Sequence, residues 1–167
     1  PYREGRLRGI SPLADVYMPD PDGSDIPTAL VVHGGAFLIG SRRMKAVRFL
    51  ATRLVQAGIG ACLVDYRLVF RGGRLEEQVT DIRDALRWWA GAATTYGGDP
   101  AAISLVGVSA GAAMSMLAAG ELEGQVPLHR IAHVFGLSEL DHMGGLLSRL
   151  LPRWETRTTD RTVWRDR

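Results

Sequence analysis

A serine flanked by glycines is the feature of this sequence with the most direct chemical meaning. Residues 105–111 read Leu-Val-Gly-Val-Ser-Ala-Gly, which places Ser109 at the centre of a Gly-x-Ser-x-Gly motif. The apolar run 103–108 before it is typical of a strand, and the Ala- and Met-rich run 110–119 after it is typical of a helix. A sharp strand-to-helix turn exposes a serine hydroxyl for nucleophilic attack, whereas a tight turn without chemistry is the alternative. The pattern predicts that Ser109 is a catalytic nucleophile.

A second glycine-bearing turn supplies the partner that such a nucleophile needs. Residues 30–37 read Leu-Val-Val-His-Gly-Gly-Ala-Phe, so an apolar strand runs directly into a turn. Acyl transfer creates an oxyanion that backbone N–H groups stabilise, and glycines let the backbone come close to it. We predict an oxyanion hole made by the amides of Gly34, Gly35 and Ala36, together with that of Ala110 directly after the nucleophile.

Four motifs follow one another in a specific order: residues 33–37, 65–68, 97–103 and 107–111. In this order they resemble α/β-hydrolases of the hormone-sensitive-lipase and carboxylesterase type, and the resemblance extends over residues 12 to 142. The family often has glycine where this chain has Ala36, which still offers an N–H. The resemblance implies hydrolysis of small carboxylic esters through an acyl-enzyme at Ser109, with no metal and no organic cofactor. It also covers formamidases and amidases, so the choice between ester and amide stays open.

The resemblance stops before the family's later strands, which would carry its usual acid and its histidine. A hydrolase of this fold orders its triad as Ser, then Asp or Glu, then His. After Ser109 the sequence predicts one more strand, residues 131–137, and a short helical stretch, residues 143–151. The tail 152–167 is polar and rich in Arg and Thr, which predicts an exposed or disordered segment. We therefore expect residues 1–167 to form a single, C-terminally truncated α/β-hydrolase domain.

Three of the four histidines are poorly placed to act as a general base. His33 belongs to the glycine turn, where a structural role is expected. His129 and His133 flank the start of the predicted strand 131–137. The start of this strand lies at the sheet edge opposite to the nucleophile. None of the three is therefore predicted to reach Ser109.

The fourth histidine and its neighbour are the remaining triad candidates. Asp141 and His142 follow the predicted strand 131–137, at the same sheet edge as Ser109. We name His142 as the candidate base and Asp141 as the candidate acid. Sequence neighbours rarely converge as an acid–base pair, so the alternative is that both residues begin a loop or cap a helix.

Alternating strand and helix patterns must position these residues. The predicted strands are 14–18, 29–33, 59–64, 103–108 and 131–137, and the predicted helices are 42–57, 76–93 and 110–119. This order predicts a three-layer α/β fold, with a mostly parallel sheet and helices on both faces. Ligands bind beyond the carboxyl ends of such strands, where His33, Asp65 and Ser109 fall. For Asp65 we expect a structural ion pair or a loop contact instead of catalysis.

Composition fits one globular domain and excludes several functions. Hydrophobic residues make up 46% of the 167 residues, charged residues make up 23%, and the net charge is +2. The arginines are scattered without a basic face, which argues against a nucleic-acid partner. Cys62 is the only cysteine, so no internal disulfide forms. No stretch is long enough to span a membrane and no signal peptide is visible, so we expect a cytoplasmic protein.

Two functional hypotheses remain. In the first, the protein is a serine hydrolase whose substrate is a small-molecule ester. In the second, it is a non-catalytic or split relic of the same fold that acts as a binding or interaction module. A truncated sheet exposes an edge strand and apolar faces, so we expect a homo-oligomer or a complementing chain to cover that edge. A catalytic histidine supplied by a partner chain would distinguish the two.

Overall fold

A computed structural model describes residues 1–3, 12–20, 22–126 and 128–134 of the chain. These residues all belong to a compact unit that spans residues 1–137. Its elements are, in chain order, β1 (Ala14–Tyr17), β2 (Ile26–Val32), α1 (Lys45–Gln56), β3 (Gly60–Val64), the 3-10 turn η1 (Val69–Arg71), α2 (Leu75–Ala92), the 3-10 turn η2 (Ala93–Tyr96), β4 (Gly98–Val108), α3 (Ala110–Glu121) and β5 (Leu128–Val134).

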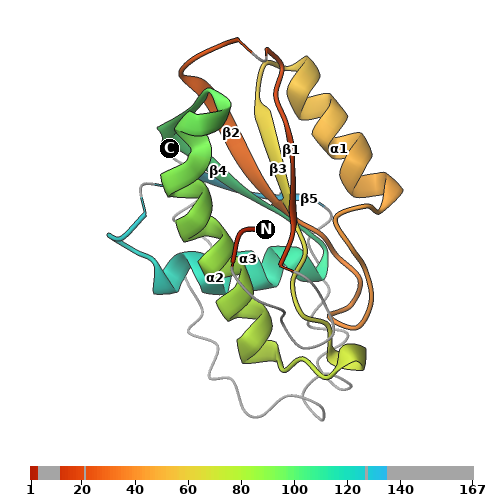
Figure 1. The fold of residues 1–167 in the computed structure, drawn as a ribbon. Coiled ribbons are helices and arrows are strands. Elements are labelled where there is room, and N and C mark those ends of the chain that lie inside the picture. Colours follow the sequence, from red (N-terminus) through yellow and green to blue (C-terminus); the bar gives the residue numbers. More distant parts are fainter. Residues whose placement is uncertain (4–11, 21, 127, 135–167) are drawn as a thin grey trace, which may run out of the picture. The chain divides into compact units, whose positions relative to one another are not determined.

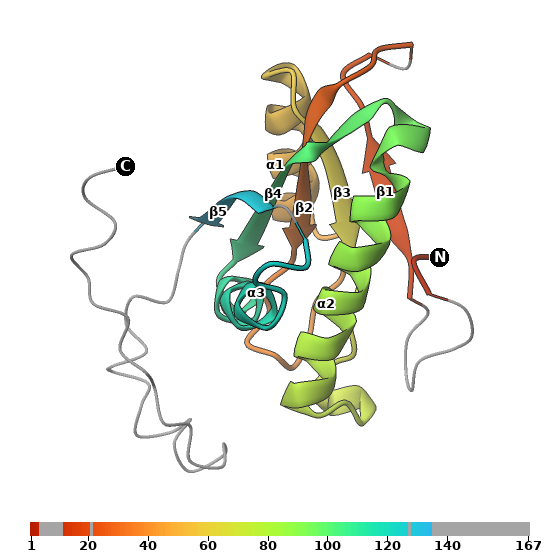
Figure 2. The same cartoon turned by 90° about the vertical axis from the view of Figure 1, so that its left-hand side faces the viewer.

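The strands form one mixed sheet in the order β1-β3-β2-β4-β5 (Figures 1 and 2). The pairs β2–β3, β2–β4 and β4–β5 are parallel, and only β1 runs antiparallel to its neighbour β3. The predicted α/β fold with a mostly parallel sheet is therefore confirmed. No helix in the described part of the chain is both long and apolar enough to cross a membrane.

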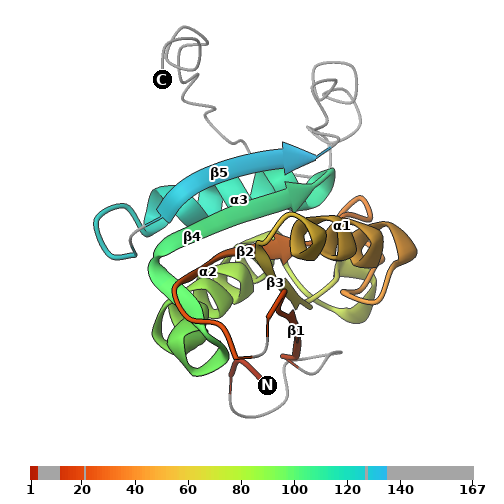
Figure 3. The same ribbon diagram turned by 90° about the horizontal axis from the view of Figure 1, so that it is seen from above.

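Helices cover both faces of the sheet and create two apolar cores. Helix α1 packs on one face, where Val47 and Ala51 meet alternate residues of the central strands. Helices α2 and α3 pack side by side on the other face, and α3 lies along β4 and β5 (Figures 2 and 3). Strand β3 is buried along its whole length, as expected for a strand covered on both faces. The indole of Trp89 connects the α2 layer to the sheet by donating to Thr28 Oγ1 at 3.0 Å.

Several predicted boundaries are wrong. Strand β2 spans Ile26–Val32 instead of 29–33, and β4 begins at Gly98 instead of residue 103. The helix predicted from residue 42 begins at Lys45, because Arg42 is held outside the helix by two carboxylates described below. The strand predicted over 131–137 is observed from Leu128 to Val134, and residues 135–137 lie outside the described residues. The predicted helix 143–151 and tail 152–167 lie outside them as well.

The strand ends meet at one edge of the sheet. Val32, the last residue of β2, pairs with Val64 at the end of β3 and with Gly107 near the end of β4. The chain then turns to opposite faces, since α1 follows β2 on one face and α3 follows β4 on the other. Such a divergence between adjacent parallel strands opens a crevice where ligands bind in α/β proteins.

Substitution of Gly107 tests how closely α3 packs on β4. A Cβ at Gly107 would lie 2.3 Å from the Cα of Ala112, so Gly107→Ala forces the helix away from the strand. We expect it to lower the free energy of unfolding by about 1–3 kcal/mol, measured by urea denaturation. Gly120→Ala is the matched control, because a Cβ there meets nothing within 4 Å and alanine favours the helix. Equal stability of the two variants would contradict the packing described here.

Candidate active site

Ser109 occupies the junction between β4 and α3. Its backbone has φ 52° and ψ −121°, a conformation that non-glycine residues rarely adopt and that costs of order 1–3 kcal/mol. The residue is half-buried, and its carbonyl accepts the first bond of the helix from the amide of Ala112 at 2.8 Å. The sharp strand-to-helix turn expected around Ser109 is therefore present, and the N-terminal end of α3 begins directly after it.

The loop after β2, residues 33–40 (the glycine loop), lies against this junction. A Cβ at Gly34 would be 2.8 Å from the carbonyl oxygen of Val108 and 3.0 Å from the Cβ of Ser109. On the other side, a Cβ at Gly111 would be 2.5 Å from the carbonyl oxygen of His33. Two segments far apart in the sequence therefore pack backbone against backbone, and only glycine fits at either position.

Four residues of the glycine loop have positive backbone φ angles. Gly35, Ala36, Phe37 and Gly40 have φ values of 128°, 52°, 68° and 129°. Among the described residues, the amides of Gly35 and Ala36 have no hydrogen-bond acceptor, and neither has that of Ala110. Free amides at a strand-helix junction are the groups that an anion or a developing oxyanion would bind.

His33 is buried inside the loop and holds it from within. Its Nδ1 is 2.7 Å from the carbonyl oxygen of Gly34, and its ring stacks on Tyr66 with centroids 4.2 Å apart. Burial lowers the pKa of His33, although the hydrogen bond to Gly34 opposes that effect, so the ring is neutral near pH 7. The structural role expected for His33 matches this environment.

Two side chains that the sequence reasoning missed bind the carbonyls of the glycine loop. The hydroxyl of Tyr66 donates to the carbonyl of His33 at 2.8 Å. The side-chain amide of Gln78, fully buried in α2, donates to the carbonyl of Phe37 at 2.9 Å, and the backbone amide of Val69 donates to the same oxygen at 3.1 Å. The available signal was the helical spacing that places Gln78 on the same face as the buried Ile82, Ala85 and Trp89.

Asp65 has a structural environment. One carboxylate oxygen accepts the backbone amide of Arg42 at 2.7 Å, and the other pairs with the Arg42 guanidinium. Asp15 on β1 binds the same guanidinium at 2.9 Å. Burial lowers the pKa of Arg42, but the two carboxylates outweigh it and raise the pKa overall. The carboxylate of Asp65 therefore joins the start of the α1 segment to the sheet, as the expected structural ion pair.

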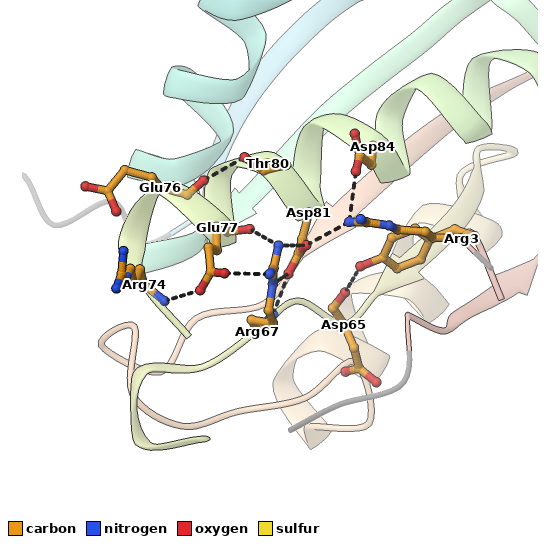
Figure 4. Close-up of polar contacts among 10 residues, drawn as sticks. Arg3, Asp65, Arg67, Arg74, Glu76, Glu77, Thr80, Asp81 and Asp84 are labelled. Atoms are coloured by element: carbon orange, nitrogen blue, oxygen red, sulfur yellow. Dashed lines mark hydrogen bonds and ion pairs between the residues drawn. The ribbon is translucent and has the colours of Figure 1, made fainter. Parts of the chain in front are cut away.

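A second arginine cluster joins β3 to α2 (Figure 4). Arg67 binds both oxygens of the fully buried Asp81, with Nε at 2.9 Å and a terminal nitrogen at 2.7 Å. Its other terminal nitrogen pairs with Glu77 at 2.8 Å, and Glu77 also accepts the backbone amide of Arg74 at the start of α2. The hydrogen bonds that Arg67 donates to Asp81 raise the pKa of Arg67, so this cation stays charged. The cluster fixes where α2, and hence Gln78, lies.

Of the residues considered for the triad, the structure describes Ser109 but neither the candidate acid nor the candidate base. Asp141 and His142 lie outside the described residues. His129 is near the start of β5 and far along the sheet from Ser109, as predicted. The prediction for His133 is wrong in its position, because β5 starts earlier than expected and His133 pairs with Gly107 near the end of β4. Neither His33 nor His129 is hydrogen-bonded to the Ser109 hydroxyl, and no cluster within the described ranges could hold a metal ion.

Comparison with known proteins shows the class that this fold and site define. Residues 14–139 match the BD-FAE family, and the chain belongs to that family of esterase-type α/β-hydrolases.

Solved and curated relatives agree with that assignment. The hyperthermophilic esterase from Pyrobaculum calidifontis superposes with a TM-score of 0.69 at 28% identity, covering 80% of this chain and 43% of that one. A probable isoprenylcysteine alpha-carbonyl methylesterase of Oryza sativa subsp. japonica is 37% identical over 98 residues, covering 59% of this chain and 23% of that protein. Phenmedipham hydrolase of Pseudarthrobacter oxydans is 35% identical over 104 residues, covering 59% and 21% respectively. The chain thus spans less than half the length of these relatives.

The arginine cluster on α2 yields a paired test of stability. Asp81→Asn leaves Arg67 without its buried charge partner, so we expect a loss of about 3–5 kcal/mol in the free energy of unfolding. Asp84→Asn, one turn along the same helix, removes only a half-exposed pair with Arg3 and should cost about 0–1 kcal/mol. Chemical denaturation measures both, and similar losses in the two variants would contradict the role given to Asp81.

Proposed function

We propose that this chain carries the nucleophile and the oxyanion hole of a serine esterase that acts on small carboxylic esters through an acyl-enzyme at Ser109. One observation carries the proposal: the strained backbone of Ser109 lies directly against Gly34, at the edge where free amides gather. Backbone strain of the kind seen at Ser109 concentrates at functional sites. Family membership supports the same chemistry.

The reaction follows from these positions. The Ser109 oxygen attacks the ester carbonyl carbon while a general base takes the hydroxyl proton, and the carbonyl oxygen becomes an oxyanion. The amides of Gly34, Gly35, Ala36 and Ala110 are the proposed donors to that oxyanion. Collapse of the tetrahedral intermediate expels the alcohol, which takes the proton back from the base. Water then attacks the acyl-enzyme by the same route and releases the acid.

His142 and Asp141 are the proposed base and acid of this reaction. Both follow β5 in the sequence, and β5 ends beside the end of β4, because Val134 pairs with Val108. The described end of β5 therefore lies at the sheet edge where Ser109 lies. No metal and no organic cofactor take part in the proposed mechanism, since proton transfer and amide hydrogen bonds account for each step.

A binding or interaction module is the second candidate function. Strand β5 is the outermost of the described strands on its side of the sheet, and an unpaired edge is a template for another strand. A second copy of the chain or a complementing chain would cover that edge and could also supply the base. This candidate predicts no acyl transfer by the chain alone, which the following experiment measures.

Acylation of Ser109 tests the proposed function. We expect p-nitrophenyl acetate to transfer one acetyl group to the Ser109 peptide, detected by mass spectrometry, with slow release of p-nitrophenol. If His142 does not reach Ser109 in the chain alone, the rate should be no more than roughly 10³–10⁴ over water. Fast Ser109-dependent turnover would show that the chain already holds its base, and His142→Gln and Asp141→Asn then ask whether these residues provide it.

Serine variants provide the controls for this assay. Ser109→Ala should abolish both the acetyl adduct and the ester cleavage above background. Ser115→Ala is the matched variant, because Ser115 is buried in the next helix and its hydroxyl has no hydrogen-bond partner among the described residues. Cleavage that survives Ser109→Ala would remove Ser109 from the mechanism, and an adduct lost in Ser115→Ala would indicate a folding defect.

A further inference from the structure

The peptide groups of the glycine loop are fixed from their carbonyl sides. In a planar trans peptide, the carbonyl of one residue and the N–H of the next point in opposite directions. A hydrogen bond to a carbonyl therefore also fixes where the following N–H points. Nδ1 of His33 lies 2.7 Å from the carbonyl oxygen of Gly34, so this contact sets the direction of the Gly35 N–H.

The next peptide is fixed in the same way by the loop itself. The amides of Leu38 and Ile39 donate to the carbonyl of Gly35 at 3.0 and 3.1 Å, which sets the direction of the Ala36 N–H. The two free amides of the loop thus each stand opposite a bonded carbonyl. The difference is that the backbone itself fixes the Ala36 amide, whereas the Gly35 amide depends on one side chain, His33.

The geometry assigns a single protonation form to His33. A carbonyl oxygen only accepts, so Nδ1 must carry the proton that it shares with Gly34. Nε2 is buried and has no partner among the described residues, and burial lowers the pKa of the ring, so Nε2 is unprotonated. The ring cannot turn freely, because it stacks on Tyr66 at an interplanar angle of 15°. The hydroxyl of Tyr66 in turn binds the carbonyl of His33 at 2.8 Å.

We propose that Tyr66 and His33 form one positioning unit for the oxyanion hole. Tyr66 orients the ring of His33. The ring in turn binds the carbonyl of Gly34 and so aims the Gly35 N–H at the reacting carbonyl oxygen. Neither residue touches the substrate. The inference rests on the function proposed above, and it adds which side chains make one oxyanion donor effective. It also explains why an imidazole is buried at this position, since an apolar side chain would leave the Gly34 carbonyl without a donor.

The rate of phosphonylation of Ser109 tests this inference. A fluorophosphonate ester places its phosphoryl oxygen where the oxyanion forms, and the adduct on Ser109 can be followed over hours by intact mass. We expect Tyr66→Phe to lower the limiting rate constant roughly tenfold with little change in the half-saturating concentration. This loss is below the roughly 10²–10³ that follows removal of an oxyanion donor outright.

Tyr2→Phe is the matched control. Tyr2 is also a buried tyrosine, and its hydroxyl donates at 2.7 Å to the carbonyl of Asp65, in the peptide just before Tyr66. Among the described residues, no hydrogen bond or ring contact joins Tyr2 to the glycine loop. Both variants lose one comparable hydrogen bond, so both should lose similar stability. Equal phosphonylation rates in the two variants would overturn the assignment, because Tyr66 would then act only on stability.

Two substitutions of His33 examine the other half of the unit. His33→Asn places an amide N–H near the former Nδ1, whereas His33→Gln places it near the former Nε2. We expect His33→Asn to retain most of the phosphonylation rate and His33→Gln to lose it. The opposite order contradicts a role through Nδ1. If neither variant folds, Tyr66→Phe against Tyr2→Phe still decides the question.

Spectroscopy separates failure of this inference from failure of the proposed function. If wild-type Ser109 takes no label, the proposed nucleophile is wrong, and a two-bond 1H–15N spectrum of the same chain still reports on His33. A ring protonated at Nδ1, with a Gly34 amide resonance that shifts in Tyr66→Phe and not in Tyr2→Phe, supports the positioning unit. A ring protonated at Nε2, or no such shift, overturns it.

Discussion

The close approach of two backbones is the constraint on which the rest of this structure depends. The glycine loop after β2 and the junction between β4 and α3 touch through Gly34 and Gly111, with no side chain between them. A side chain at either position would separate the segments and displace Ser109 from the amides beside it. The interior is close-packed, so such a displacement could not be absorbed locally. The strained backbone of Ser109 persists because packing on both sides of the junction holds it.

Polar contacts behind that junction determine where the two segments lie. Arg42 and Arg67 each bind two carboxylates, and these connect β1, β3, the α1 segment and α2. Removing one partner of a buried pair leaves a charge without compensation, so the clusters oppose any shift of these elements. Helix α2 then presents Gln78 to the carbonyl of Phe37. Helix α2 thus supports the glycine loop through Gln78.

Membership of the BD-FAE family accounts for the order of the elements, and the chain covers only part of its relatives. The fold was predictable from the sequence to a large degree, because buried parallel strands are apolar runs and helices α1 and α2 show a clear helical period. The boundaries were less predictable. Arg42 fits a helical pattern but is drawn into ion pairs with Asp15 and Asp65, which only the folded sheet brings together. Likewise, the start of β5 depends on its register with β4, because pairing with a neighbour and not hydrophobic pattern defines a strand end.

The sequence by itself determined the elements, the position of Ser109 between a strand and a helix, and the glycine turn after β2, because these features are local and follow from residue type and spacing. Only the tertiary structure decided which contacts hold the turn. Tyr66 lies 33 residues from His33 in the chain, and Gln78 lies 41 residues from Phe37. Nothing in their local pattern specifies a carbonyl partner, since a hydroxyl or an amide N–H can donate to many acceptors, and only the folded sheet and α2 bring one within reach. Long-range hydrogen bonds of this kind arise from packing. Local sequence therefore indicates where Ser109 and the glycine turn lie, whereas the tertiary structure determines how their backbone groups are oriented.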